Sequence, residues 1–397
     1  MALMPTRKTR NTALALIPQV SRGTFVDPAA NLMPISNLTD NIESVTVQNS
    51  EYTGSIDQNG DEVVGKQVTI SFDVNLRGPG GADVPSAGAY LPGILLVNAK
   101  MTEVITATAI PAAPEALSAG STTGFTGGAG MTGTLDLYKG MLVRLLGVST
   151  SLAGVSAIRT NSASKVVELC ETFGSTLTGN YQIPKQLAYV NSISSTDPLP
   201  LSLKVWIGGK RYDLVDCQVT SAIVAVQTST SKQGSIPVLR FSLAAIIYNT
   251  ADEDTPAIPS LGTTPKFKNG KQFVAKKALG GSGFELNFGL QTDAAPNPNQ
   301  TTGDEGDELV GKQITLTPNL LSYRKADFDQ MALADAQSQH PYFALWGETP
   351  GQIVSVIVPD GRFKHAGDDM GGTHVTQAPQ MLIDVKTKGV VIAFPYY

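Results

Sequence analysis

Charge is scarce in this 397-residue chain. Asp, Glu, Lys and Arg make up 16% of the residues, against about 25% in typical soluble proteins. The 29 basic and 34 acidic residues leave a net charge of −5, so the chain lacks the concentrated basic surface that grips a phosphate backbone. The same shortage argues against long coiled coils, which need Glu, Lys and Leu in bulk. A surface with so little charge suits burial against other subunits.

Cysteines and long apolar runs are also missing. Cys170 and Cys217 are too few for a disulfide framework or a usual zinc site, so we expect two buried free thiols in a protein made in a reducing cytosol. There is no run of about 18 apolar residues that could span a membrane. Pro18 interrupts the short apolar run 13–17, so we expect no signal peptide.

Catalytic and metal-binding patterns are absent as well. The chain has three histidines, and the two in segment 365–374 have a spacing that matches no metal-ligand signature. The Gly-rich segments 78–81 and 280–283 fail the dinucleotide and phosphate-loop fingerprints. The motifs G-x-S-x-G, H-E-x-x-H and C-x-x-C do not occur. We therefore expect no enzyme, no cofactor and no bound metal.

Alternating apolar and polar residues predict a mainly β chain. Within 66–76, one face of a strand carries Val68, Ile70, Phe72, Val74 and Leu76. Residues 42–48 alternate too, and 203–215 read as two strands joined at Gly208-Gly209. We expect further strands over 219–228, 236–248, 273–279, 284–290, 311–317, 352–358 and 381–394.

Helices are predicted at only three places. Residues 87–100 carry Pro92 at a favourable first-turn position, and 326–340 carry Asp327 or Asp329 near their start. The third candidate, 162–173, is short.

Three turn-rich segments divide the chain. Residues 107–134 are too long for a passive connector, 250–266 have an acidic cluster and three prolines, and 293–308 are a polar excursion. We predict an N-terminal arm over 1–35, a first domain over 36–255 with a long inserted loop at 107–134, a linker over 256–266, and a second domain over 267–397.

An internal repeat is the most informative feature. Residues 60–69 read GDEVVGKQVT and residues 306–315 read GDELVGKQIT, so eight of ten positions are identical. A background match of roughly 6% per position makes this improbable by chance. Both copies follow a predicted strand and lead into another strand and a helix. We interpret the repeat as a duplicated β unit, packed either into one compact domain or as two quasi-equivalent subunits of a ring. Gly65 and Gly311 then mark a bulge or a close backbone approach.

Residues 203–256 resemble the tail tube (major tail) proteins of long-tailed bacteriophages. They begin with LKVWIGGKRYDLV, a hairpin over a Gly turn, and continue with two long strands. The second of these contains LRFSL, of the form apolar-Arg-Phe-x-Leu, and a Pro-containing exit follows. Residues 36–101 show a similar order, with a strand ending near EYTG, the segment KQVTISFDVNLRG and a short helix containing LPGILL. Residues 267–394 look like the second domain of some longer relatives.

The resemblance implies duplicated tail-tube-type β-sandwich domains, each with a flanking helix, whose inner sheets form a β-barrel tube on oligomerisation. It implies a structural virion protein made in the host bacterial cytoplasm, located in the virion tail and forming a hollow conduit for genome delivery. Its partners would be further copies of itself in stacked trimeric or hexameric rings, and other tail proteins (tape measure, terminator, tail tip and possibly sheath). DNA would pass through the lumen without specific binding.

The resemblance also suggests which residues make contacts. We expect lumen-facing or ring-contact residues at Asp61, Glu62, Lys66, Asp307, Glu308 and Lys312, and ring-stacking residues at Arg7, Lys8, Arg10 and Phe125. Such tubes present six tube-type domains per ring, so two tube-type copies per chain favour three chains, whereas an outward second copy requires six. The alternatives are a tail-tip or baseplate hub component and a β-sandwich adhesion protein.

Overall fold

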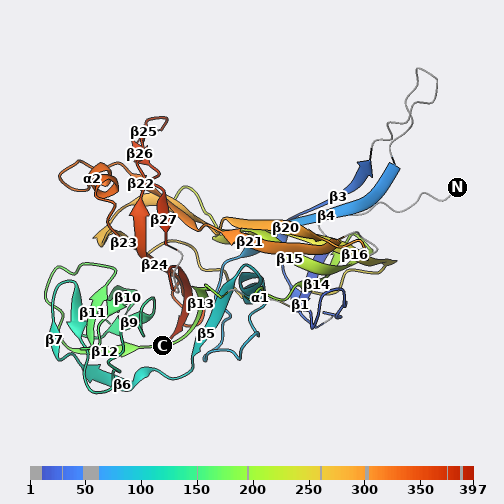
Figure 1. Cartoon of the computed structure of the whole chain (residues 1–397). Coiled ribbons are helices and arrows are strands. Elements are labelled where there is room, and N and C mark those ends of the chain that lie inside the picture. Colours follow the sequence, from blue (N-terminus) through green and yellow to red (C-terminus); the bar gives the residue numbers. More distant parts are fainter. Residues whose placement is uncertain are drawn as a thin grey trace.

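The chain folds mainly into β-strands, which confirms the predicted fold class at that level (Figure 1). The computed structural model describes residues 11–28, 30–47, 62–149, 151–194, 196–259, 262–299, 304–372, 374–384 and 388–397. Strands account for 52% and helices for 5% of the structure.

The first half of the chain contains the longest strands. Its elements are β1 (Thr12–Pro18), β2 (Leu32–Met33), β3 (Ser36–Val47), β4 (Glu62–Asn75), α1 (Leu91–Asn98), β5 (Met101–Thr106), β13 (Lys185–Asn191), β14 (Leu201–Ile207), β15 (Lys210–Gln227) and β16 (Val238–Asp252). An insert between β5 and β13 holds β6 (Ile110–Ala116), β7 (Ala119–Gly120), β8 (Gly124–Thr126), β9 (Leu142–Leu145), the 3-10 turn Leu152–Gly154, β10 (Val155–Asn161), β11 (Val166–Leu169) and β12 (Asn180–Ile183).

The second half is built from shorter strands. Its elements are β17 (Lys271–Val274), β18 (Lys277–Ala278), β19 (Gly281–Asn287), β20 (Leu290–Pro296), β21 (Asp304–Lys312), β22 (Thr315–Leu321), α2 (Gln330–Asp335), β23 (His340–Trp346), β24 (Val354–Phe363), β25 (Asp368–Asp369), β26 (Thr376–Gln377), β27 (Met381–Ile383) and β28 (Val391–Tyr396).

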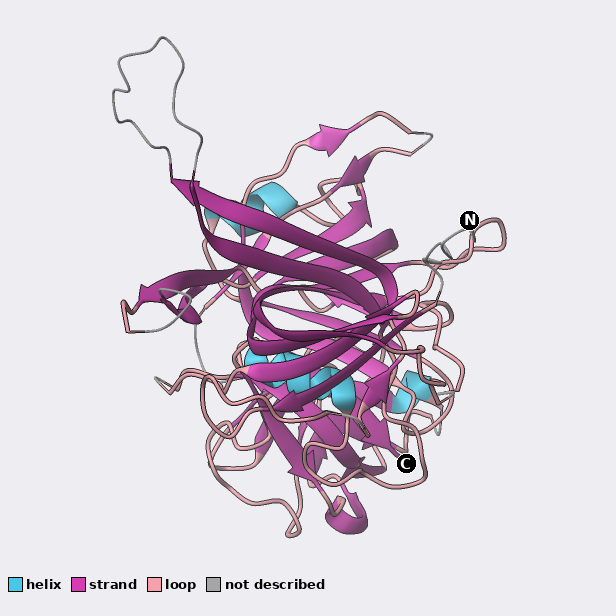
Figure 2. Cartoon of the chain, turned by 90° about the vertical axis from the view of Figure 1, so that its right-hand side faces the viewer, coloured by secondary structure: helices cyan, strands magenta, loops and turns pink. Residues whose placement is uncertain are grey.

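One continuous series of antiparallel pairings runs through both halves. Its order is β3–β4–β16–β15–β19–β22–β27–β24–β28–β13–β5. The strands curl into a half-barrel with helix α1 among them (Figure 2). Leu95 and Leu96 of α1 are fully buried in the largest apolar core, together with side chains of β1, β4, β15, β16 and β22. This core contains apolar side chains from both halves of the chain, and their burial stabilises the two halves together.

Local sequence signals account for several elements. The five alternating apolar residues of 68–76 are all buried, as predicted. Gly208 and Gly209 form the turn between β14 and β15 with φ of +58° and +90°, values that favour glycine. Strand β15 then continues as one element to Gln227, because register shifts within its pairing with β16 absorb the irregularity that suggested two strands.

Two of the three predicted helices exist, each shorter than expected. Helix α1 has Pro92 in its first turn, and Asp329 caps α2 by accepting a hydrogen bond from the Ala332 N–H. The helix predicted over 162–173 is wrong. The β-branched residues Val166 and Val167 lie there in β11, which pairs with β10 on one side and β8 on the other.

The inserted loop predicted over 107–134 is also wrong. These residues contribute β6, β7 and β8 to a seven-stranded sheet of order β6-β12-β9-β10-β11-β8-β7. The many glycines suggested a loop, but a Cβ at Gly120 or Gly124 would lie about 2 Å from the carbonyl oxygen of Leu177 or Val167. Glycine is therefore needed here for close packing of the backbone. The insert has its own core and packs its second face on β13, β23, β24 and β28.

The two copies of the repeat pair in the same register. Strands β3 and β4 pair in the first copy, and β19–β20 and β21–β22 pair in the second. Seven pairs recur 246 residues later, namely Thr39↔Ser71 as Glu285↔Thr317, Asp40↔Ile70 as Leu286↔Leu316, Asn41↔Thr69 as Asn287↔Thr315, Ser44↔Lys66 as Leu290↔Lys312, Val45↔Gly65 as Gln291↔Gly311, Thr46↔Val63 as Thr292↔Leu309, and Val47↔Glu62 as Asp293↔Glu308. The register of both copies shifts beside Gly65 and Gly311, which confirms the predicted bulges.

The second copy differs from the first by a corner between β19 and β20. Gly289 has φ of +54°, and a Cβ there would lie 2.1 Å from the carbonyl oxygen of Gln313. At this corner β20 and β21 leave the main sheet as a two-stranded ribbon, which lies along β15 and β16 in Figure 1. The first-copy ribbon, formed by the outer parts of β3 and β4, instead projects from the body (Figure 1).

Candidate functional site: a polar sheet face with a free edge

The solvent-facing side of the main sheet is lined by small, mostly uncharged residues. We call this surface the polar face; its residues are Thr39 and Asn41 of β3, Thr69, Ser71 and Asp73 of β4, Arg240, Ser242 and Ala244 of β16, Ser221, Ile223 and Ala225 of β15, Glu285 and Asn287 of β19, and Thr315 and Thr317 of β22. Three of these fifteen residues are charged. In the inner strands β4, β15, β16, β19 and β22 they alternate with buried apolar residues, because successive side chains of a strand point to opposite sides of the sheet.

Cross-strand pairing arranges the polar face in rows. One row runs through Thr39, Ser71, Ser242 and Ser221, and the Ser71 and Ser242 hydroxyl oxygens are 2.8 Å apart. A second row runs through Asp73, Arg240, Ile223, Asn287 and Thr315, and so crosses from the first repeat to the second. The polar face is therefore one surface that both halves of the chain build.

The charges on the polar face are partly paired. The Asp73 carboxylate accepts a hydrogen bond of 2.7 Å from the Asn37 side-chain amide and lies 4.0 Å from the Arg240 guanidinium. At such exposed positions each pair contributes little to stability. Their effect is to leave the face nearly neutral, with Glu285 as a small acidic excess.

Strand β3 forms a free edge of this sheet. It pairs with β4 along one side, and in the part of the chain that the structure describes no strand pairs with its other side. Eleven of its twelve residues are exposed, including Ile42, Val45 and Val47. A long exposed edge carrying apolar side chains is a template for pairing with another chain.

The predicted contact residues of the first repeat lie on the projecting ribbon. Glu62 begins β4 and Lys66 follows four residues later, and both are exposed. Asp61 lies outside the described residues. Neither Glu62 nor Lys66 belongs to the polar face defined above.

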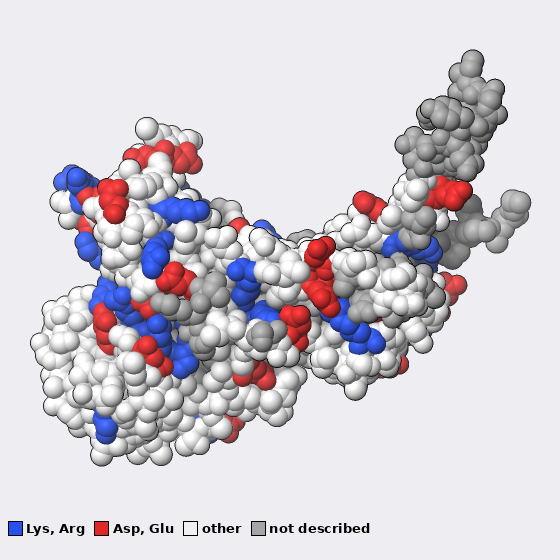
Figure 3. All heavy atoms as spheres, in the orientation of Figure 1, with Lys and Arg blue, Asp and Glu red and all other residues white. Residues whose placement is uncertain are grey.

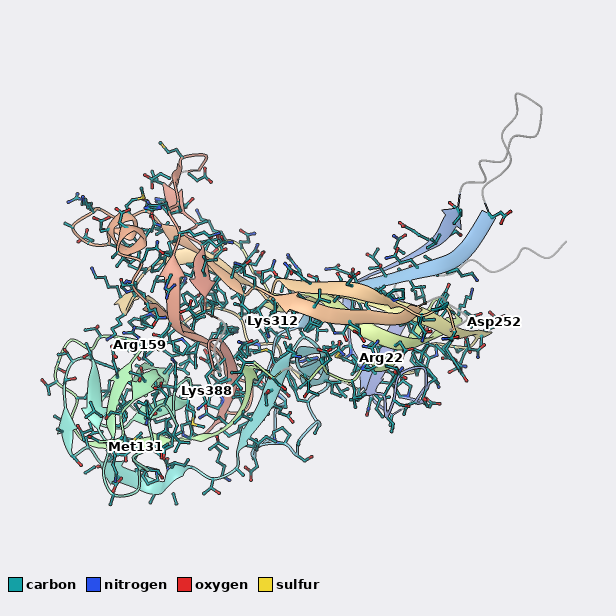
Figure 4. All side chains as sticks on the ribbon, viewed as in Figure 1. Arg22, Met131, Arg159, Asp252, Lys312 and Lys388 are labelled. Carbon is teal, nitrogen blue, oxygen red and sulfur yellow. The ribbon has the colours of Figure 1, made fainter. Side chains whose placement is uncertain are left out.

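The corresponding residues of the second repeat contact the first half of the chain. The Lys312 ammonium donates a hydrogen bond of 2.7 Å to the Lys100 carbonyl oxygen, directly after α1. Burial, together with the positive charge of Lys100, lowers the pKa of Lys312 to about 8. The Glu308 carboxylate lies 3.5 Å from the Arg22 guanidinium. Within the ribbon itself, the Asp307 carboxylate accepts a hydrogen bond of 3.5 Å from the Thr292 hydroxyl. Figure 4 labels Lys312, at the end of strand β21 in the β20–β21 ribbon, and Arg22, which follows β1.

Phe125 is not a surface residue, which corrects its expected role in ring stacking. Its side chain is 3% exposed and its ring centroid lies 5.0 Å from that of Tyr181 in the core of the insert. The sequence suggested a long inserted loop here, whereas Phe125 lies in strand β8 with its ring in the core of the insert. The other expected stacking residues, Arg7, Lys8 and Arg10, lie outside the described residues.

Ion pairs attach the insert to the body. The Arg159 guanidinium lies 3.1 Å from Asp360 and 3.0 Å from Glu168, and the Lys139 ammonium lies 2.6 Å from Asp360. Burial tends to raise the pKa of Asp360, but Lys139 and Arg159 outweigh it and hold that pKa below its usual value. Figure 3 shows charged side chains gathered over this part of the molecule, while the insert surface is mostly uncharged.

The structure also bears on catalytic and membrane chemistry. Across the described ranges, no three His, Cys, Asp or Glu side chains gather in a way that could hold a metal ion. His365 pairs with Asp335 at 2.8 Å on an exposed surface. No helix in the described part of the chain is long and apolar enough to cross a membrane. Cys170 and Cys217 are buried free thiols, as predicted.

Sequence reasoning missed the polar face. The alternation of Thr69, Ser71 and Asp73 with apolar residues was visible in the sequence, but the pairing that joins them to Asn287 and Thr315 was not. No protein-family model and no curated protein matches the chain.

Proposed function

We propose that the chain is a structural virion protein that polymerises into the tail tube of a long-tailed bacteriophage. The observation that carries this proposal is the polar face: one curved, nearly neutral sheet surface, built by both repeats and ending at the free edge β3. A conduit for DNA needs such a lining, because clustered basic side chains would bind the phosphates and slow the passage of the genome.

The recurring pairing register supports the proposal that the chain is a duplicated tube-type unit. Both copies contribute strands to the same sheet, which favours three chains per ring over six. In this arrangement the polar face lines the lumen, and the insert lies away from it as an outward decoration. Our sequence-based expectation placed Glu62, Lys66 and their counterparts at the lumen or the ring contact; in this proposal they do not line the lumen.

The remaining partners are proposed from the same role. The tube would stack ring on ring, contact the tape measure, terminator and tail-tip proteins and possibly a sheath, and reside in the virion tail. We propose no catalytic activity and no cofactor.

Negative-stain electron microscopy of the purified chain tests the proposal. We expect hollow rings or tubes, and we expect the protein to be among the most abundant bands of a purified virion. A low copy number at one end of the tail would instead support a tail-tip or hub component.

A further inference from the structure

The joint between the two halves of the chain involves a strand-to-strand contact. Strand β19 pairs with the end of β15 through Ile223↔Asn287, Val224↔Leu286, Ala225↔Glu285, Val226↔Phe284 and Gln227↔Gly283. The ribbon β20–β21 then follows β15, and Lys312 donates its hydrogen bond to the carbonyl oxygen of Lys100. Strand β19 and the β20–β21 ribbon of the second repeat unit thus pack on strand β15 of the first.

The second half contains a counterpart of the receiving strand. The pairs Val224↔Leu239 and Ala225↔Val238 of β15 and β16 recur as Asp368↔Gln377 and Asp369↔Thr376 of β25 and β26. The pairs Val74↔Leu239 and Asn75↔Val238 of β4 and β16 recur as Leu320↔Gln377 and Leu321↔Thr376. Residues 367–371 therefore occupy the place in the second unit that 223–227 occupy in the first.

The helices are also equivalent at their ends. Lys100 follows the cap of α1 with φ of +64°, and its N–H donates to the carbonyl oxygen three residues earlier. Gln337 follows the cap of α2 with φ of +49° and makes the same hydrogen bond. The carbonyl of Gln337 thus corresponds to the carbonyl that Lys312 binds, and Lys66 corresponds to Lys312.

Side chains at the internal joint between β15 and β19 are buried, whereas those at the equivalent places in β3 and in residues 367–371 are exposed. Phe288 is fully buried, whereas Ile42, its counterpart 246 residues earlier, is 43% exposed. Val226 is 1% exposed, whereas Met370, at the corresponding place in the second unit, is 77% exposed. The two exposed positions lie at opposite ends of the molecule, on the β3–β4 ribbon and near β25 (Figure 1). The chain therefore has one unused half of the joint at each end.

We propose that β3 of one chain adds to residues 367–371 of a second copy, in the register of the internal joint. The expected pairs run from Asn41↔Gly367, through Thr39↔Asp369, to Asn37↔Gly371 of the second copy. Lys66 then donates to the carbonyl oxygen of Gln337 of the second copy. The contact is head-to-tail, so successive copies close a ring or continue as an open helix. The inference rests on the proposed function and specifies the contact by which the ring would form.

One position in this joint is less favourable than in the template. Asp40 would face Asp368 of the second copy, where the internal joint has the apolar pair Leu286 and Val224. Like charges directly opposite each other destabilise a strand pair. Asp40→Leu should therefore strengthen assembly several-fold, measured as a lower critical concentration in light scattering.

Disulfide trapping tests the register. The variant Thr39→Cys/Asp369→Cys places two cysteines at the positions of Glu285 and Ala225, whose Cα atoms face each other in the internal joint. Opposite positions of paired strands lie within reach of a disulfide. We expect mild oxidation of the assembled protein to give intermolecular disulfides in non-reducing electrophoresis. Mixing the two single variants should give disulfide-linked dimers and nothing larger, since each chain then has one new thiol.

Two control variants define the result. Asp40→Cys/Asp369→Cys shifts one thiol to the other face of β3 and should cross-link at least ten-fold less. Ala225→Cys/Glu285→Cys should form a disulfide within one chain. Tubes that form without the Thr39–Asp369 disulfide would overturn this inference and leave the proposed function standing. A chain that stays monomeric under all conditions would overturn both.

Discussion

At the residue scale, Lys312 makes a direct contact between the two halves. Its ammonium is mostly buried at the end of α1, where it donates a hydrogen bond to the neutral carbonyl oxygen of Lys100. Burial penalises the charged form, which explains the lowered pKa of about 8. The Lys312 hydrogen bond therefore fixes where the ribbon lies against α1, while burial of its charge lowers the stability of the fold near neutral pH.

Lys312 predicts a pH-dependent stability with a definite sign. Between pH 8 and 10.5 the unfolded chain binds more protons at this site than the folded chain, so stability rises with pH over that window. Relative to Lys312→Met, the wild type should gain about 1–3 kcal/mol in free energy of unfolding across it. Denaturant unfolding at several pH values measures this difference. Lys232→Met, at an exposed position, serves as the control. If the stability of the wild type relative to Lys232→Met rose by the same amount between pH 8 and 10.5, the gain could not come from Lys312.

Phe125 gives a second prediction at this scale. Because its ring fills the core of the insert, Phe125→Ala should lower the free energy of unfolding of the insert by about 3–5 kcal/mol. The exposed Leu135→Ala should change it by less than about 0.5 kcal/mol. Thermal unfolding followed by near-ultraviolet circular dichroism compares the two. Equal stabilities would mean that Phe125 is a surface residue after all.

At the scale of elements, the polar face explains why so many small hydroxyl side chains occupy central strands. Ser71 and Ser242 face each other at 2.8 Å, and no large side chain rises above the sheet on that row. Such a surface presents dipoles in place of net charge. A passing polyanion would meet neither strong attraction nor strong repulsion.

Adding positive charge to the polar face should change how assembled protein treats DNA. Ser71→Lys/Ser242→Lys should make tubes retain duplex or single-stranded DNA, with a retention that falls steeply as salt rises. The control Ser175→Lys/Thr176→Lys adds the same charge to exposed positions of the insert. Filter binding at 50 and 200 mM salt compares the two variants. Stronger retention by the control would place the lumen elsewhere.

Sequence patterns predicted the regular elements of this fold better than its irregular ones. Strand β4 was predictable because its apolar residues alternate over its inner half, and β14–β15 because two glycines mark their turn. The strands of the insert were missed because its sequence is rich in glycine, as loops are. Gly120 and Gly124 are in fact needed where two backbones approach closely. The free edge and the polar face depend on which strands pair, and pairing between residues as far apart as Ser71 and Ser242, 171 positions from each other, leaves no local signal.

At the scale of the whole molecule, the insert is held to the body by an apolar face and by ion pairs around Arg159. Asp360→Asn would leave Arg159 and Lys139 with less compensation in a partly buried place, which should weaken docking of the insert by about 1–3 kcal/mol. We expect a separate, earlier transition in calorimetry. A single transition at the wild-type temperature would contradict this role.

At the same scale, the two units of the repeat are arranged so that their joint can be repeated between copies of the chain. Two units with the same pairing register join through β15 and β19, and their unused counterparts lie at opposite ends. A molecule built in this way is suited to repeat its internal joint between copies. The polar face would then continue from chain to chain around a channel.

The most direct test is a cryo-electron microscopy reconstruction of the polymerised chain. We predict a hollow tube whose inner wall carries Ser71, Ser242 and Asn287, with the insert of residues 110–183 outside. A reconstruction with the polar face on the outer wall, or a chain that remains monomeric under all conditions, would contradict it.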